Sequence, residues 1–198
     1  SLMVQGAKVW AISQEDAEAL SHLGATSVRA LPCTYDAAGP WTSSGAAARG
    51  VYHLGALDWL PNVQGLQWYL EQVHPHVHVP VTVISRYWPS HVHAPSGLTH
   101  LPRLEDGFSF DAHGIFMAPI LSGSGMRIKL LEAMVRGKAI VTTSIGAEGL
   151  QNAPGISVAN EPRAFAAAIQ RLVDDKDYRM AQGAAAQAHA RATFADDA

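Results

Sequence analysis

The chain has 198 residues, of which 48% are hydrophobic and 16% charged, and its formal net charge is -3. A chain of this size can bury one good core and a fragment of a second, and its scattered basic residues lack the positive patch of a nucleic-acid-binding protein. The single cysteine, Cys33, excludes an internal disulfide framework and a cysteine-based zinc site, and it fits a reducing cytoplasm.

Residues 7–36 are predicted to form one βαβ-like unit. Its strands are "KVWAIS" and "SVRALP", and its helix, "QEDAEALSHLG", begins at Ser13 and stops at Gly24. Residues 37–50 are rich in Gly, Ser and Ala and show little apolar periodicity, which is typical of a linker. We therefore expect a domain boundary in that segment and a second domain over residues 51–198.

From residue 51 onward, strand-like and helix-like segments alternate. Strands are expected over "VYHLGAL", "VPVTVIS", "LTHLPRL", "GIFMAPI", "AIVTTS" and "ISVAN". Helices are expected over "NVQGLQWYLEQV", from about Gly125 to Arg136, and over the Ala-rich segments "PRAFAAAIQRLVDD" and "YRMAQGAAAQAHARATF". This alternation predicts an α/β fold with a doubly wound, Rossmann-like parallel sheet, in which ligands bind beyond the carboxyl ends of the strands.

The segment between "GIFMAPI" and the following helix has the features of an anion site. Small residues, Ser122–Gly125, allow a ligand to approach the backbone closely, and the positive end of the helix dipole favours negative charge. Arg127 and Lys129 add two cations within about one turn of that point. We expect Ser122–Met126 to contact a phosphate-bearing ligand.

Helical spacing predicts that the residues after this loop form two stripes. The polar stripe consists of Gly125, Lys129, Glu132 and Arg136. The second stripe, which faces the sheet, consists of Ile128, Leu131 and Val135. A carboxylate on the polar stripe can accept hydrogen bonds from the hydroxyl pair of a ribose or sugar. The cations and Glu132 together indicate a nucleotide whose diphosphate lies over the helix start.

A purely structural interpretation remains open for each residue taken alone. Lys129 and Glu132 can form an ordinary surface ion pair, and the Ser-Gly loop can be a turn with a capping serine. Two familiar nucleotide motifs do not fit, because Ile128 stands where the dinucleotide fingerprint needs its third glycine, and Ala139 follows Gly137-Lys138 where a Walker loop needs Ser or Thr.

Two segments, "GMRIKLLEAMVRGKAIVTTSIGAEGL" and "HLGALDWLPNVQGLQWYLEQVHP", resemble the carboxyl-terminal, donor-binding domain of retaining GT-B glycosyltransferases. The likeness is strongest to bacterial members similar to those that build surface polysaccharides, and it runs from about residue 7 to the end. The resemblance implies a two-domain enzyme in which the missing amino-terminal domain holds a glycan or lipid-linked acceptor. Residues 7–36 would then be the last βαβ piece of that acceptor domain, and the isolated chain would be inactive.

The resemblance also implies roles for individual residues. Glu132 matches the second of two glutamates that contact the donor and would bind the ribose, whereas Ser124 stands in place of the first, the sugar contact. The family often has an Arg after Gly55 and a Lys before Gly65, but Ala56 and Gln64 stand there. We therefore expect Arg127 and Lys129 to be the catalytic cations that stabilise the leaving diphosphate, with no metal or other cofactor.

Several further residues are candidate ligand contacts. His76 and His78, if extended, place two imidazoles on one face, but no neighbouring ligand completes a metal site, so surface histidines are favoured. Arg86 follows a strand and reaches either a phosphate or solvent. By resemblance, Gly55 also belongs to the donor site, and the segment ending at Arg103 holds the base.

These observations favour the nucleotide-sugar-binding domain of a retaining glycosyltransferase. Two alternatives stay open, a non-catalytic module that binds a nucleotide or a partner protein, and a GT-B sugar-nucleotide epimerase. No apolar run approaches the roughly 20 residues that cross a bilayer. We expect a cytoplasmic location, with any membrane contact being peripheral and at the inner face.

Overall fold

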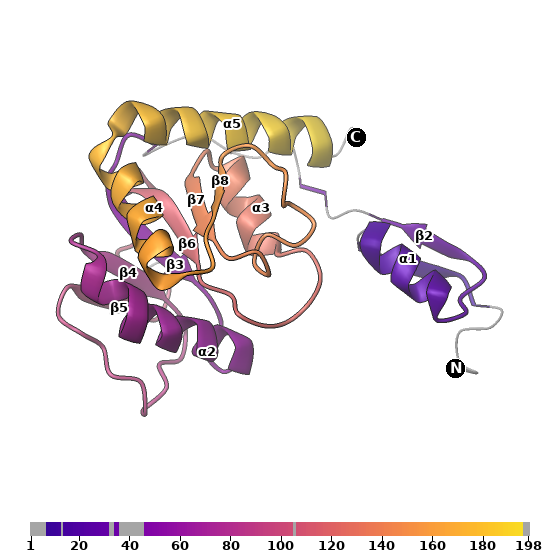
Figure 1. The fold of residues 1–198 in the computed structure, drawn as a ribbon, viewed down its shortest axis with the longest axis horizontal. Helices are drawn as coiled ribbons and strands as arrows, with labels where there is room; N and C mark the ends of the chain where they lie inside the picture. Colours follow the sequence, from indigo (N-terminus) through magenta and orange to yellow (C-terminus); the bar gives the residue numbers. More distant parts are fainter. Residues whose placement is uncertain (1–6, 13, 32–33, 36–45, 105, 196–198) are drawn as a thin grey trace.

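The structure, a computed structural model, describes residues 7–12, 14–31, 34–35, 46–104 and 106–195. Its main feature is a six-stranded, fully parallel sheet with the order β5-β4-β3-β6-β7-β8 (Figure 1). The strands are β3 (Gly50–Leu54), β4 (Val81–Ile84), β5 (Leu98–Leu101), β6 (His113–Ala118), β7 (Ala139–Thr142) and β8 (Ile156–Val158). All six strands expected from the sequence are confirmed, as is the doubly wound, Rossmann-like fold.

The order of the strands reverses between β3 and β6. The chain runs outward from β3 through β4 to β5, then returns to pair β6 against the other edge of β3, with Tyr52 opposite Phe116. The connections after β3 and β6 therefore leave the sheet in opposite directions, and a crevice opens between them at the carboxyl ends of these strands. This is the place in the fold where a ligand is expected.

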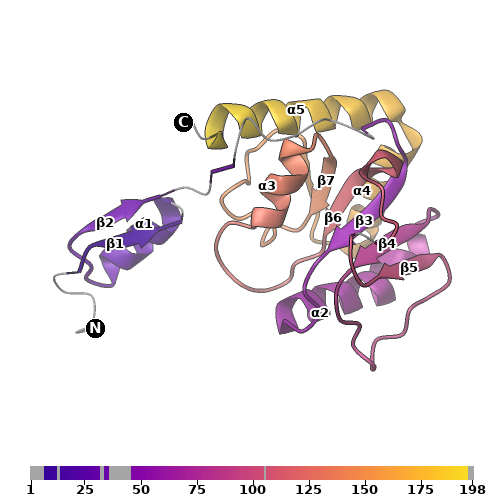
Figure 2. The same ribbon diagram turned by 180° about the vertical axis from the view of Figure 1, so that it is seen from behind.

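Helices cover both faces of the sheet. The helices α2 (Leu60–Trp68) and α4 (Pro162–Asp174) pack on one face, and α3 (Ile128–Val135) and α5 (Lys176–Phe194) on the other (Figures 1 and 2). The predicted helix "NVQGLQWYLEQV" is confirmed but irregular, because α2 continues as a π-helix over Tyr69–Val73 and a 3₁₀ turn over His74–His76. A further 3₁₀ turn, Phe110–Ala112, precedes β6.

The first described residues form the expected small βαβ unit. Strands β1 (Val9–Ala11) and β2 (Val28–Ala30) pair in parallel, and α1 (Gln14–His22) connects them. Beyond β2, Tyr35 forms an isolated parallel bridge with Ala195, which directly follows α5. Most of the predicted linker, as well as Cys33 and Ser13, falls outside the described residues, and Gly50 belongs to β3 rather than to the linker.

The start of α3 differs from the prediction. We expected the helix to begin near Gly125, but it begins at Ile128, because Gly123 and Gly125 have φ angles of 108° and 84° that no right-handed helix contains. The expectation that Ile128 faces the sheet is also wrong, since it is 62% exposed, whereas Leu131 and Val135 are buried as predicted. The Ser-Gly segment is thus a wide loop before the helix rather than its first turn.

Gly65 sets how closely α2 approaches β6. A Cβ atom at this position would overlap the carbonyl oxygen of Pro119, which directly follows β6.

We expect Gly65→Ala to destabilise the protein by about 1 to 3 kcal/mol, as overpacking of a close contact does. Urea unfolding followed by circular dichroism measures this cost. The exposed neighbour Gln64 provides the control, since Gln64→Ala should change stability by less than about 0.5 kcal/mol. Equal unfolding midpoints for the two variants would contradict the argument.

Candidate functional site

A cleft of about 510 Å³ opens at the switch point, between the start of α2 and the loop that precedes α3. Eleven residues line it: Trp59, Pro61, Asn62, Ile120, Ser122, Gly123, Ser124, Met126, Arg127, Ile128 and Lys129. The structure therefore brings together both predicted catalytic cations and, except for Gly125, the predicted loop contacts. A cleft of this size and position can accept a small anionic ligand.

Lys129 reaches across the cleft to the opposite helix. Its Nζ atom donates a hydrogen bond of 3.0 Å to Oδ1 of Asn62, in the first turn of α2. Burial and, to a smaller extent, the nearby positive charge of Arg127 together lower the pKa of Lys129 to about 8. Among the described residues, no carboxylate forms an ion pair with this ammonium group, so an anion in the cleft would stabilise its charged form.

Arg127 folds back over the Ser-Gly loop. Its Nη1 atom donates to the carbonyl oxygen of Ser124 at 2.8 Å, and its Nη2 atom lies 3.0 Å from the place where a Cβ of Gly123 would be. The Nε and Nη2 atoms are buried and have no hydrogen-bond partner among the described residues. Because unsatisfied buried donors on a charged group are costly, these two atoms are well suited to phosphate oxygens.

A second contact ties the loop to α2. The Ser122 hydroxyl donates to Oε1 of Gln64 at 3.3 Å. Two side chains of α2, Asn62 and Gln64, therefore face Lys129 in the first turn of α3 and Ser122 in the loop before it. These two hydrogen bonds connect the opposing walls of the cleft.

Glu132 lies outside this cleft. It accepts hydrogen bonds from Nη2 and Nε of Arg136 at 3.1 and 3.3 Å, one helical turn further along α3. It lines a separate cavity of only about 10 Å³, which it shares with Lys129, Tyr52 and Arg136 among others. The expectation that Glu132 faces the same space as the anion site is therefore wrong for the side-chain position in this structure, and its contact with a ribose stays a prediction.

The remaining predicted contacts are spread along the same edge of the sheet. Arg86 is exposed and lines a neighbouring cleft of about 420 Å³ with Ala56 and Leu57. Arg103 is exposed beyond the end of β5 and lines neither cleft. Gly55 does not line the first cleft, and a Cβ on it would come within 2.8 Å of Nε2 of His53. The structure thus does not bring Arg86, Arg103 and Gly55 into one site with Arg127.

Two side-chain expectations are corrected. His76 belongs to a 3₁₀ turn and His78 follows beyond it, so the two imidazoles are not placed by an extended segment as we supposed. The sequence also predicts that the large aromatic residues Trp59 and Trp68 pack in or near the core. Trp59 is instead 62% exposed and forms part of the cleft wall. Trp68 does pack inside, with its ring centroid 5.4 Å from that of Phe165.

Sequence reasoning missed Asn62, Trp59 and Ile120 as cleft residues. One signal was available for Asn62, since polar residues in the first turn of the helix that follows β3 must lie at the carboxyl edge of the sheet. No local pattern marks Ile120, because it extends an apolar strand and reads as core. Among the described helices, none is both long and apolar enough to cross a membrane.

A parallel sheet of this order, with a ligand-sized cleft at its switch point, defines a Rossmann-like domain of the kind that forms one half of GT-B enzymes. The chain belongs to the family described as glycosyl transferases group 1, whose model matches residues 48–175. A relative from Klebsiella pneumoniae, described as an uncharacterized 44.6 kDa protein in the cps region, is 32% identical over 135 residues, which are 59% of this chain and 35% of that protein.

Solved structures confirm the fold. The chain is similar to Anabaena HepE in complex with UDP-glucose, with a TM-score of 0.70, 18% identity and coverage of 98% of this chain and 62% of that one. Sucrose-phosphate synthase from Thermosynechococcus elongatus gives a TM-score of 0.70 at 16% identity, with coverage of 98% and 56%. The chain thus spans about a third of the Klebsiella relative and less than two thirds of these two structures.

Proposed function

We propose that this chain is the donor-binding half of a retaining glycosyltransferase and that the cleft at the switch point holds the diphosphate of a nucleotide sugar. The observation that supports this most directly is the pair of cations at the start of α3. Among the described residues, Arg127 has two buried donors without partners, and Lys129 is bonded to the neutral amide of Asn62 and to no carboxylate. Similar structures solved with UDP and glucose support a UDP-sugar donor.

The two cations would act on the leaving group. When the bond between the sugar and the diphosphate breaks, its electron pair stays on the phosphate oxygen, and negative charge grows there. Fixed cations at that point stabilise the transition state more than the bound donor, so they raise turnover rather than only tightening binding. Because Arg127 and Lys129 supply this charge, the proposal needs no metal ion or other cofactor.

The rest of the donor would extend along the same edge of the sheet. Ser124 lies in the cleft where a sugar contact is expected, and Glu132 would reach the ribose only after releasing Arg136. Arg86 and the segment ending at Arg103 lie further along the edge, toward the proposed place of the base. A glycan or lipid-linked acceptor would bind to another domain, and the relative in a cps region supports a role in polysaccharide synthesis. We place the reaction in the cytoplasm, at or near the inner membrane face.

One calorimetric panel tests donor binding. UDP-glucose, GDP-glucose and ADP-glucose are titrated into this chain, and we expect weak but measurable binding of UDP-glucose. The same titration with Arg127→Ala should show at least about tenfold weaker binding, since charge-assisted contacts to the diphosphate are lost. If none of the three donors binds, or if Arg127→Ala binds as well as the unchanged chain, the cleft is not a diphosphate site.

A non-catalytic binding module is the second candidate. Ser124 in place of a carboxylate and the pairing of Glu132 with Arg136 favour it, because both weaken the grip on the sugar. Transfer or hydrolysis of the donor by the complete enzyme distinguishes the two, since a module would bind the donor without consuming it. An epimerase would instead interconvert the donor sugar without an acceptor.

A further inference from the structure

We propose that Asn62 is a positioning residue that holds the Lys129 ammonium group across the cleft while leaving its positive charge available to the ligand. This inference rests on the proposed function, because it assumes that the ligand is a diphosphate. It assigns a role to a residue of α2, on the opposite wall from both cations.

Both polar atoms of the Asn62 side-chain amide form hydrogen bonds. Its Oδ1 atom accepts from Nζ of Lys129 at 3.0 Å, and its Nδ2 atom donates to the carbonyl oxygen of Ala56 at 2.9 Å. The second bond fixes the orientation of the amide, so that the oxygen, and not the nitrogen, faces the lysine. Lys129 is thereby connected to the turn that follows β3, on the far side of the switch point.

The groups around Lys129 show why a neutral partner matters. Arg127 repels its charge, and Glu132, which lines the small cavity beside it, is bonded to Arg136. His53 on β3 is buried, and burial followed by the charge of Lys129 lowers its pKa to about 3, so that the ring stays neutral near pH 8. A carboxylate at position 62 would neutralise the lysine and repel a diphosphate, whereas an amide oxygen orients the ammonium group without cancelling its charge.

The inference predicts a proton linkage that calorimetry can measure. With a pKa of about 8, Lys129 is half charged at pH 8, and a bound diphosphate favours the charged form and raises this pKa. Binding of UDP-glucose at pH 8 should therefore take up roughly half a proton from the buffer. Titrations in two buffers of different ionisation enthalpy give this number. UDP-glucose is a suitable probe because its diphosphate is a diester and does not titrate near pH 8.

Variants of Asn62 separate its two hydrogen bonds. Asn62→Ala removes both bonds, so the pKa of Lys129 should fall, proton uptake at pH 8 should rise toward one, and affinity should drop about tenfold. Asn62→Asp keeps an acceptor for Lys129 but cannot donate to Ala56. Its carboxylate should raise the pKa of Lys129, which removes the uptake at pH 8 and moves it to higher pH.

A double-mutant cycle tests whether Asn62 acts through the lysine. Lys129→Ala alone should abolish the proton uptake, and adding Asn62→Ala to it should change affinity by less than about twofold. Equal uptake by Asn62→Ala, Asn62→Asp and the unchanged chain would overturn the role of Asn62, even if Lys129→Ala weakens binding. Undiminished binding and uptake in Lys129→Ala would instead overturn the proposed diphosphate site itself, so the two failures are distinguishable.

Discussion

Replacing Lys129 with Ala should lower the turnover number of the complete enzyme by about 100-fold to 1,000-fold, the range seen when one preorganised charge stabiliser is removed from an active site. The reason is geometric, because Lys129 holds its ammonium group across the cleft at the carboxyl ends of β3 and β6, where the leaving diphosphate would lie. Initial rates of sugar transfer at saturating donor measure the loss. Donor affinity should fall by a smaller factor than turnover.

Arg127→Ala should act in the same direction, with a comparable loss of turnover, because it removes the two unpaired donors beside the loop. Lys176→Ala is the matched control, since Lys176 is exposed at the start of α5, away from the cleft lining, and its loss should leave turnover unchanged. Unchanged turnover and donor affinity in both cleft variants would remove Arg127 and Lys129 from the mechanism.

Much of the fold was predictable because the strands are short and nearly continuously apolar, as strands covered on both faces must be. β7 shows this plainly, since all four of its residues, Ala139–Thr142, are buried. The anion loop was also predictable in position, because a Gly-rich segment between a central strand and a helix always lies at the carboxyl edge of a parallel sheet. Its shape was not, because the local sequence does not specify which glycines adopt left-handed φ angles, and those of Gly123 and Gly125 delay the start of α3 to Ile128.

The partners of the polar side chains were the least predictable part of the site. Helical spacing placed Glu132 on the same stripe as both Lys129 and Arg136, and each of these cations was a possible partner. The structure pairs Glu132 with Arg136, while Lys129 bonds to a residue 67 positions away in the sequence. Only the three-dimensional meeting of α2 and α3 at the switch point reveals Asn62, which no local pattern could have connected with the lysine.

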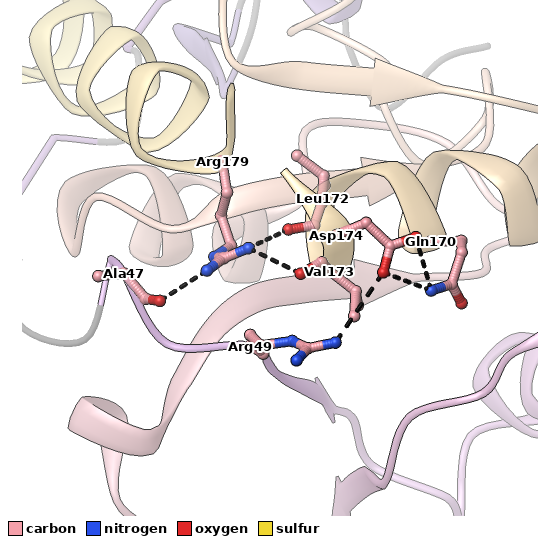
Figure 3. A network of polar contacts seen from close by, with 7 residues as sticks. All are labelled: Ala47, Arg49, Gln170, Leu172, Val173, Asp174 and Arg179. Atoms are coloured by element: carbon pink, nitrogen blue, oxygen red, sulfur yellow. Dashed lines mark hydrogen bonds and ion pairs between the residues drawn. The ribbon is translucent and has the colours of Figure 1, made fainter. Parts of the chain in front are cut away.

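A buried arginine outside the cleft lining connects the end of α4 to the segment before β3. Arg179 of α5 is 1% exposed, and its Nη1 atom donates to the carbonyl oxygens of Leu172 and Val173 at the end of α4 (Figure 3). Its Nη2 atom donates to the carbonyl oxygen of Ala47 at 2.6 Å, on the segment that leads into β3. One side chain thus caps α4 and fastens the start of the central strand to it.

We therefore expect Arg179→Met to lower the free energy of unfolding by about 3 kcal/mol, because methionine keeps the apolar bulk but leaves three carbonyl oxygens without their donor. The melting temperature should fall by roughly 6 to 12 °C for a chain of this size. Arg49→Ala is the control, since Arg49 lies beside the same network (Figure 3) and forms an exposed ion pair with Asp174 at 3.9 Å, which should contribute less than about 1 kcal/mol. Scanning calorimetry measures both melting temperatures. Equal values for the two variants would contradict the prediction, because they would mean that the buried hydrogen bonds of Arg179 stabilise the protein no more than the exposed pair of Arg49 does.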